Sequence, residues 1–350
     1  MEAATTMKRV NVMSDHIITN SSFNIPLSVL DVSPIVEGGS VSESLSNTLD
    51  LAQHAEKWGY NRYWLAEHHN APSIASSATS IVIGHVASGT SKIRVGSGGI
   101  MLPNHAPLVI AEQFGTLESL FPGRIDLGLG RAPGTDGLTA TALRGNRGGN
   151  GHDFPEKLAE LRAFLDPTRT ELGMPVRAIP GEGLDIPIWL LGSSDFSAML
   201  AAELGLPFAF AGHFSPTFTV PAMNLYRSSF KPSEVLDKPK GMVAVNVVAA
   251  DTDEEAAYLA TSMQQLFLSF IRNTRGALPA PVRDMDTVWT PQEKIALQQQ
   301  LGSSIVGGPD TVRSKLKQYI EATKADEIMV AAHIFDHKAR LRSYEIIAGL

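Results

Sequence analysis

The fold class that the sequence predicts is a closed (β/α)8 barrel. Short apolar runs alternate with amphipathic segments along almost the whole chain of 350 residues. The apolar runs are continuous, which is typical of parallel strands that are covered by helices on both faces. Eight strand–helix units can be traced, the number that closes such a barrel. A doubly wound open sheet is the alternative fold, because the same alternation also builds it.

The strands are predicted where apolar runs are bounded by Gly, Pro or polar residues. They are expected at residues 26–34, 62–67, 93–99, 124–130, 186–192, 207–212, 241–250 and 326–335. Helices are expected where apolar residues recur every three or four positions, as Leu45, Leu49, Ala52 and Ala55 do before Gly59. They are expected at residues 42–58, 76–88, 105–121, 154–165, 194–204, 216–230, 253–272 and 310–323, and at the end of the chain.

Two stretches interrupt this alternation. Residues 131–152 are rich in glycine and are predicted to form a long loop. Residues 276–304 contain prolines, Trp289 and a run of glutamines, and we interpret them as an insertion or lid. Residues 1–24 are polar and aperiodic, which indicates an N-terminal extension. We therefore expect residues 25–350 to form a single barrel domain.

The composition narrows the class of protein. It is 43% hydrophobic and 19% charged, which is typical of a globular chain, and the net charge of −7 argues against a nucleic-acid partner. The absence of cysteine excludes disulfides, thiolate metal sites and cysteine nucleophiles. No run of 18 apolar residues and no signal-peptide pattern is present, so a cytoplasmic protein that does not span a membrane is expected.

Glu67, His68 and His69 follow the second predicted strand, at the end where barrel enzymes carry their active sites. Neighbouring strand residues point to opposite faces, so adjacent histidines seldom bind one metal, and no metal site is predicted. We expect one histidine to face the barrel mouth as a proton donor or acceptor, with a carboxylate of the cluster orienting an imidazole. The structural alternative is that these side chains only cap the strand end.

A second candidate site follows the fifth strand. Gly192 ends that strand, and Ser193, Ser194 and Ser197 open a helix whose free N–H groups favour an anion. Arg131 follows the fourth strand, from where its guanidinium could clamp the same phosphate. The structural alternatives are an ordinary N-cap and a surface arginine. Pro133 breaks the GxGxxG pattern after that strand, which argues against a Rossmann site.

The third strand, "VGSGGIMLP", carries three glycines. Glycine within a strand marks a bulge or a close approach of the backbone to something else. A flat ring system above Gly98 and Gly99 is one candidate for that neighbour, and a plain bulge is the other.

Four motifs in order, "WLAEHH", "VGSGGIMLP", "FPGRIDLGLGRAPG" and "GSSDFSAMLAAELGLPFAFA", resemble the bacterial luciferase-like monooxygenases. The likeness extends over residues 26–350 and is greatest to the branch of flavin-dependent oxidoreductases that do not emit light. It departs from the light-emitting enzymes at Gly130, where they carry a reactive cysteine. The segment at Asp153 also offers no second phosphate-binding arginine.

The resemblance implies a (β/α)8 barrel with FMN at the carboxyl ends of the strands. It implies that His68 is the active-site histidine that serves the oxygenated flavin, and Glu67 beside it is the second catalytic candidate. Arg131, Ser194 and Ser197, together with Ser193, match the phosphate site. Gly98–Gly99 matches a cis peptide bond beneath the flavin ring, and residues 276–304 match a loop that closes the site.

The activity that the resemblance implies uses reduced FMN, delivered by a separate flavin reductase, and O2. The substrate would be a small organic molecule such as an aldehyde, ketone or sulfur compound, and a homodimer is expected by analogy. Three alternatives stay open: an F420-dependent oxidoreductase, a flavin-binding protein without catalysis, and a sugar-phosphate barrel enzyme. The sequence identifies neither the substrate nor the reductase.

Overall fold

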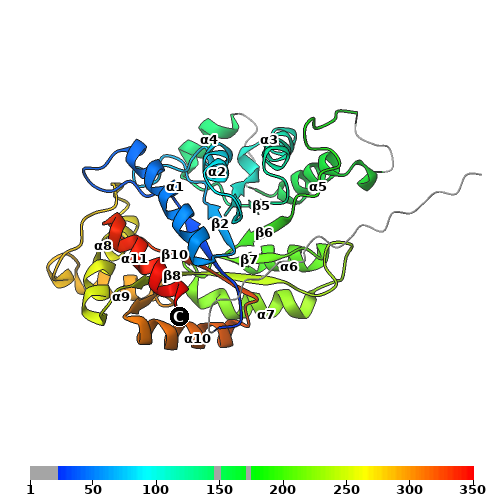
Figure 1. Ribbon diagram of the computed structural model, residues 1–350. Helices are drawn as coiled ribbons and strands as arrows, with labels where there is room; N and C mark the ends of the chain where they lie inside the picture. The colour runs from blue at the N-terminus through cyan, green and yellow to red at the C-terminus, as the bar shows by residue number, and fades with distance from the viewer. Residues whose placement is uncertain (1–22, 146–150, 171–174) are drawn as a thin grey trace, which may run out of the picture.

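The computed structural model (Figure 1) describes residues 23–145, 151–170 and 175–350. The predicted N-terminal extension, residues 1–24, lies almost wholly outside these ranges. The strands are β1 (Leu27–Asp31), β2 (Arg62–Leu65), β3 (Arg94–Ser97), β4 (Ile100–Met101), β5 (Ile125–Gly130), β6 (Ile188–Gly192), β7 (Phe208–Phe210), β8 (Gly241–Ala249), β9 (Ile305–Gly307) and β10 (Glu327–Ala331).

The α-helices cover the outside of these strands. They are α1 (Val41–Trp58), α2 (Thr79–Ser88), α3 (Pro107–Leu120), α4 (Gly137–Arg144), α5 (Phe154–Leu165), α6 (Asp195–Leu204), α7 (Thr219–Ser229), α8 (Asp253–Ile271), α9 (Pro291–Gln300), α10 (Pro309–Thr323) and α11 (His337–Ala348).

The sheet closes on itself. Its parallel strands run in the order β10–β1–β2–β3–β5–β6–β7–β8, and β8 pairs with β10 to complete the ring. The first and last helices, α1 and α11, lie side by side in Figure 1 because β1 and β10 are neighbours. The prediction of a (β/α)8 barrel is confirmed, and the open sheet is excluded.

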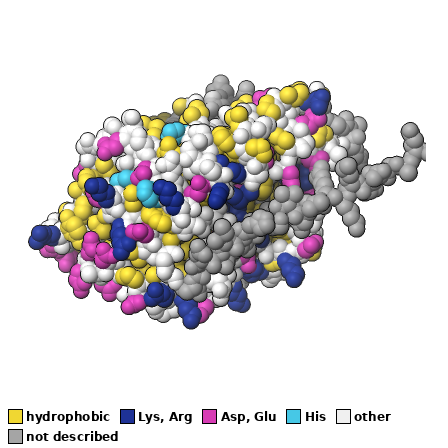
Figure 2. All heavy atoms as spheres, viewed as in Figure 1, with side chains coloured by type: hydrophobic (Ala, Val, Ile, Leu, Met, Phe, Trp, Pro, Cys, Tyr) yellow, Lys and Arg dark blue, Asp and Glu magenta, His cyan; other side chains and the backbone are white. Residues whose placement is uncertain are grey.

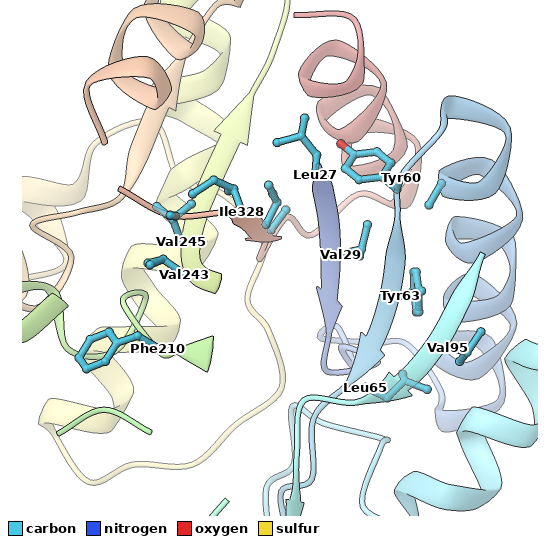
Figure 3. Close-up of a cluster of buried hydrophobic side chains, with 14 of the residues drawn as sticks. Leu27, Val29, Tyr60, Tyr63, Leu65, Val95, Phe210, Val243, Val245 and Ile328 are labelled. Atoms are coloured by element: carbon cyan, nitrogen blue, oxygen red, sulfur yellow. The ribbon is translucent and has the colours of Figure 1, made fainter. Parts of the chain in front are cut away.

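The buried apolar side chains form two clusters. The larger one fills the layer between the strands and the helices, and Figure 3 shows Val29, Tyr63 and Val95 of this layer on three neighbouring strands. The smaller one fills the inside of the barrel and includes Trp64 and Trp189. Alternate residues of each strand thus face helices and barrel interior, as the period of a strand requires.

The barrel interior changes character along its axis. At the amino ends of the strands it holds a buried ion network, in which Arg62 binds Asp126 and Glu327, each at 2.8 Å. Large rings fill the middle, and towards the carboxyl ends the inward side chains are small: Ala66, Ala209, Ala244 and Ala331. The network and the rings fill the lower part of the barrel, so the carboxyl end is the candidate ligand-binding end.

Two local predictions, for residues 131–152 and for the third strand, need correction, and a third gains detail. The glycine-rich stretch 131–152 contains α4, whose N-cap Asp136 accepts a hydrogen bond from the Thr139 N–H. The segment 276–304, predicted as an insertion or lid, holds α9, which begins with a capping box of Thr290 and Glu293. The third strand stops at Ser97 and resumes as β4 after Gly98–Gly99.

Candidate active site

The inward rows of side chains continue beyond the strands into polar residues at the barrel mouth. His68 follows Ala66 by two positions, Asn246 follows Ala244, and His333 follows Ala331. Asn246 lies in β8, whereas His68 and His333 follow β2 and β10, and these three strands lie far apart in the sequence. The barrel therefore gathers them around its carboxyl end, as active-site residues of this fold are gathered.

Glu67 points the other way from His68. Its carboxylate is 1% exposed, and it accepts hydrogen bonds from His69 Nε2 at 2.7 Å, His105 Nε2 at 2.9 Å and the Met101 N–H at 2.9 Å. Burial alone would raise the pKa of Glu67, but the bonds from His105 and His69 outweigh it and lower the pKa to about 2. The carboxylate thus orients His69 and His105 and makes no bond to His68.

His68 sits among apolar and aromatic groups at the mouth. Its Nδ1 lies 3.3 Å from the carbonyl oxygen of Gly134, and its ring meets Phe214 edge-on at 6.5 Å between centroids. Burial lowers the pKa of His68, so the imidazole is neutral at neutral pH. Because a carbonyl can only accept, Nδ1 carries the hydrogen and Nε2 keeps a free lone pair.

Two further histidines lie close enough to interact electrostatically with His68. Burial, and then repulsion from His333 and His68, lowers the pKa of His213 to about 3. Burial is also the main cause that lowers the pKa of His333 to about 4, with repulsion from Arg340 next. All three imidazoles are therefore uncharged at neutral pH, and the mouth on this side is aromatic and neutral.

Residues of the predicted anion site lie together at the start of α6. The guanidinium carbon of Arg131 lies 4.2 Å from the centre of the Phe196 ring, which places its charge beside the first turn of the helix. Among the described residues, Arg131 has no ion-pair partner. Ser194 is the N-cap residue of α6, but its hydroxyl makes no hydrogen bond to the backbone of the first turn. The alternative that Ser194 only caps the helix with its side chain is therefore not supported.

The three serines differ in their surroundings. Ser193 is exposed, Ser194 is half-buried, and Ser197 is buried against Gly192. A Cβ on Gly192 would lie 2.4 Å from the Ser197 Cβ, so this close contact requires glycine. Asp195 in the first turn carries a negative charge, so Arg131 is the group that makes this helix end attractive to an anion.

The peptide bond between Gly98 and Gly99 is cis, as the resemblance to the luciferase-like monooxygenases implied. A Cβ on Gly98 would lie 2.7 Å from Leu30 Cδ1, and one on Gly99 would lie 2.7 Å from the Gly128 carbonyl oxygen. These contacts explain both glycines by packing inside the barrel. They do not by themselves require a ring above the bond.

The segment before α9 reaches the mouth. Arg275 donates to Asp136 at 2.8 Å and to the Asn70 carbonyl at 2.9 Å. Leu278 is fully buried and exchanges backbone hydrogen bonds with Ile35 and Glu37. The segment is therefore tied across the loops that follow β1, β2 and β5.

Sequence reasoning did not single out Asn246 and left His213, His333 and His105 without a firm role. The sequence does indicate that Asn246 and His333 face the barrel interior, because each follows an inward-facing alanine, Ala244 or Ala331, by two positions. His105 could not be assigned in this way, since its partner Glu67 lies on another loop. No group of three or more acidic or histidine side chains within the described ranges is arranged to hold a metal ion.

The chain belongs to the luciferase-like monooxygenase family, whose model matches residues 27–326. A luciferase-like monooxygenase of Escherichia coli K12 is 54% identical over 322 residues, covering 92% of this chain and 96% of that protein. The uncharacterised Bacillus subtilis protein YvbT is 63% identical over 324 residues, covering 93% and 96%. The crystal structure of apo-MsnO8 is 38% identical, with a TM-score of 0.86 over 93% of this chain and 97% of that one.

More distant structures share the fold alone. The oxygenating constituent of 3,6-diketocamphane monooxygenase from Pseudomonas putida, in complex with FMN, is 19% identical with a TM-score of 0.70 over 93% of this chain and 96% of that one. An F420-dependent secondary alcohol dehydrogenase is 11% identical with a TM-score of 0.65 over 93% and 99%. The fold itself thus accommodates either cofactor.

Family membership and the site together support an oxygenase-type enzyme. Among the described residues, the mouth offers a cation without an ion-pair partner beside a helix start and, on the other side, neutral imidazoles, of which His68 keeps the lone pair of Nε2. On the described part of the face in Figure 2, basic side chains are interspersed with acidic and hydrophobic ones. None of the described helices is long and apolar enough to cross a membrane.

Proposed function

We propose that this protein is an FMN-dependent monooxygenase that oxidises a small organic substrate with O2. The observation that carries the proposal is the position of Arg131. Its guanidinium has no ion-pair partner in the described chain, lies over Phe196 at the start of α6, and belongs to the mouth that also holds His68. A cation without a counter-ion beside a helix N-terminus fits a phosphate.

The residues present fit the FMN phosphate. Arg131 and the unused hydroxyl of Ser194 would bind it, together with the N–H groups that begin α6, while Ser193 and Ser197 complete that turn. The small side chains above Trp64 and Trp189 would support the ring end of the molecule. Reduced FMN supplies two electrons to O2, so that one oxygen atom enters the substrate and the other leaves as water.

His68 is the group that we assign to proton transfer. Its Nδ1–H donates to Gly134, which fixes the tautomer and leaves Nε2 able to accept a proton. The lowered pKa keeps that lone pair free at neutral pH. Glu67 cannot share this task directly, because its carboxylate is bound to His69 and His105. We assign Glu67 a positioning role.

Reduced FMN would come from a separate flavin reductase, as the family resemblance implies. A homodimer is also proposed, and large apolar side chains exposed on neighbouring helices support it: Ile81 of α2, and Val109 and Leu120 of α3. Sedimentation velocity distinguishes the two states. A dimer that Ile81→Glu and Leu120→Glu dissociate is expected, and a wild-type monomer would contradict this part of the proposal.

A titration of the purified protein with FMN, reduced FMN and F420 tests the proposed cofactor. Tight binding of FMN, with weaker binding of F420, is expected, because Arg131 at the start of α6 would pair with the terminal phosphate of FMN, whereas the phosphate of F420 continues into an acidic tail. Consumption of O2 with reduced FMN should then depend on the protein. Preference for F420 would replace the proposal with a hydride-transfer enzyme, and FMN binding without any effect on O2 would leave a flavin-binding protein.

A further inference from the structure

The mouth holds two polar side chains that the proposed chemistry does not use. Asn246 extends the inward row of β8 beyond Ala244, and His213 follows β7 by three residues. They belong to β8 and to the loop after β7, whereas the phosphate site uses residues that follow β5 and β6. A ligand that reaches from the phosphate site across the mouth would meet these two side chains.

Each of the two side chains has one buried atom without a partner. These atoms are Nδ1 of His213, which is 6% exposed, and Oδ1 of Asn246, which is 0% exposed. The Asn246 amide cannot be turned around, because its Nδ2 donates to the His213 carbonyl at 3.2 Å. Buried polar atoms in folded proteins are almost always hydrogen-bonded, so this pair points to a missing partner.

Aromatic rings form a wall beside this pair. His213 lies 4.2 Å from Phe214, Phe214 lies 6.2 Å from Phe267, and Phe267 lies 5.9 Å from His333, all between ring centres. Phe214 also meets the ring of His68 and is 44% exposed, so it lies at the open rim. Such rings favour an apolar body next to them.

The surroundings of these side chains also argue against a charged partner of either sign. The Asn246 oxygen would repel a carboxylate, and the imidazole of His213 is uncharged. The charged groups that face His333 are Arg340 and Asp31, and they bind each other at 2.6 Å. Among the described residues on this side of the mouth, Arg340 is therefore not free to receive an anion, and Asp31 is not free to receive a cation.

Resting on the proposed function, we propose that the substrate is an uncharged molecule whose apolar part lies against Phe214. Its polar part is a group that both donates and accepts, such as an amide or a hydroxyl. That group donates to Asn246 Oδ1 and pairs with His213 Nδ1. Asn246 and His213 thus determine specificity, while His68 serves the reaction itself.

Three probes of nearly equal shape test the proposal: phenylacetamide, phenylacetate and propylbenzene. Their dissociation constants are measured by ligand-observed NMR on the FMN-loaded protein and again on the flavin-free protein. Phenylacetamide is expected to bind about tenfold more tightly than phenylacetate. Equal or tighter binding of phenylacetate, or no binding of phenylacetamide, overturns the proposal.

Variants connect this preference to the two side chains. His213→Phe keeps an aromatic ring but removes Nδ1, and Asn246→Leu removes the acceptor oxygen. Each variant should weaken the binding of phenylacetamide about 3- to 10-fold. The binding of propylbenzene should be unaffected. Asn246→Asp retains the acceptor oxygen and should keep the amide bound. His85→Phe, on the exposed side of α2, is the matched control and should change nothing.

The two levels of the account fail separately. If FMN does not bind, the proposed function is wrong, yet the probe preference can still be measured on the flavin-free protein. Suppose that FMN binds and O2 is consumed, but the protein does not prefer phenylacetamide to phenylacetate, or both His213→Phe and Asn246→Leu retain that preference. In that case only the substrate inference is wrong.

Discussion

Replacement of Arg131 by methionine removes the positive charge and keeps an unbranched, shorter side chain. A charge-assisted hydrogen bond contributes about 1.5–3 kcal/mol, so the affinity for FMN should fall about 10- to 150-fold. Phe196 holds the guanidinium through a ring contact at 4.2 Å. Such a contact contributes about 0.5–1 kcal/mol, so Phe196→Leu should weaken FMN only about 2- to 5-fold.

Riboflavin provides the control for this prediction, because it has the same ring system and no phosphate. Dissociation constants of both ligands are measured for both proteins by the quenching of flavin fluorescence. Arg131→Met should weaken the binding of FMN and leave the binding of riboflavin almost unchanged. An equal loss for both ligands would refute the reasoning, because it would mean that Arg131 supports the shape of the mouth rather than a phosphate.

Three other predictions concern the histidines and Glu67. His68→Asn should lower turnover about 10²- to 10⁴-fold with little change in FMN affinity, which steady-state kinetics would check. Glu67→Gln leaves buried N–H donors facing an amide and should cost about 2–4 kcal/mol of unfolding free energy; an unchanged urea midpoint would contradict this. The pKa values of His213 and His333 are lowered in the folded protein, whereas in the unfolded chain both histidines have the ordinary pKa of about 6.5. Below pH 6.5 the unfolded chain therefore binds more protons than the folded protein does. Stability should therefore fall as the pH falls from 6.5 towards 4, by up to about 1.4 kcal/mol per pH unit for each histidine, and His213→Asn should flatten this slope.

The barrel could be predicted because its signal is local. Continuous apolar strands such as 241–250 and amphipathic helices such as 42–58 follow from residue order alone. The helix α4 was missed because Gly134 precedes it, Gly137 begins it and Gly145 ends it, a pattern that is typical of a loop. Strand β9 was missed because it is short and gains its stability only from pairing with β8.

The site was harder to predict than the fold. The inward direction of His68 follows from the strand period, and so would that of Asn246. The partners of Glu67 do not follow from it, because His105 reaches it across 38 positions of the chain. The meeting of Arg131 with Phe196 likewise depends on how the loop after β5 folds onto α6. Neither contact leaves a periodic trace in the sequence.

The most direct test of the account is a stopped-flow experiment in which protein loaded with reduced FMN is mixed with oxygenated buffer. If the mouth binds FMN through Arg131 and α6 and excludes water beside His68, the oxidised-flavin spectrum should emerge only after a lag. The lag should shorten in His68→Asn. Reoxidation at the rate of free reduced FMN, with no lag, would contradict the proposed monooxygenase.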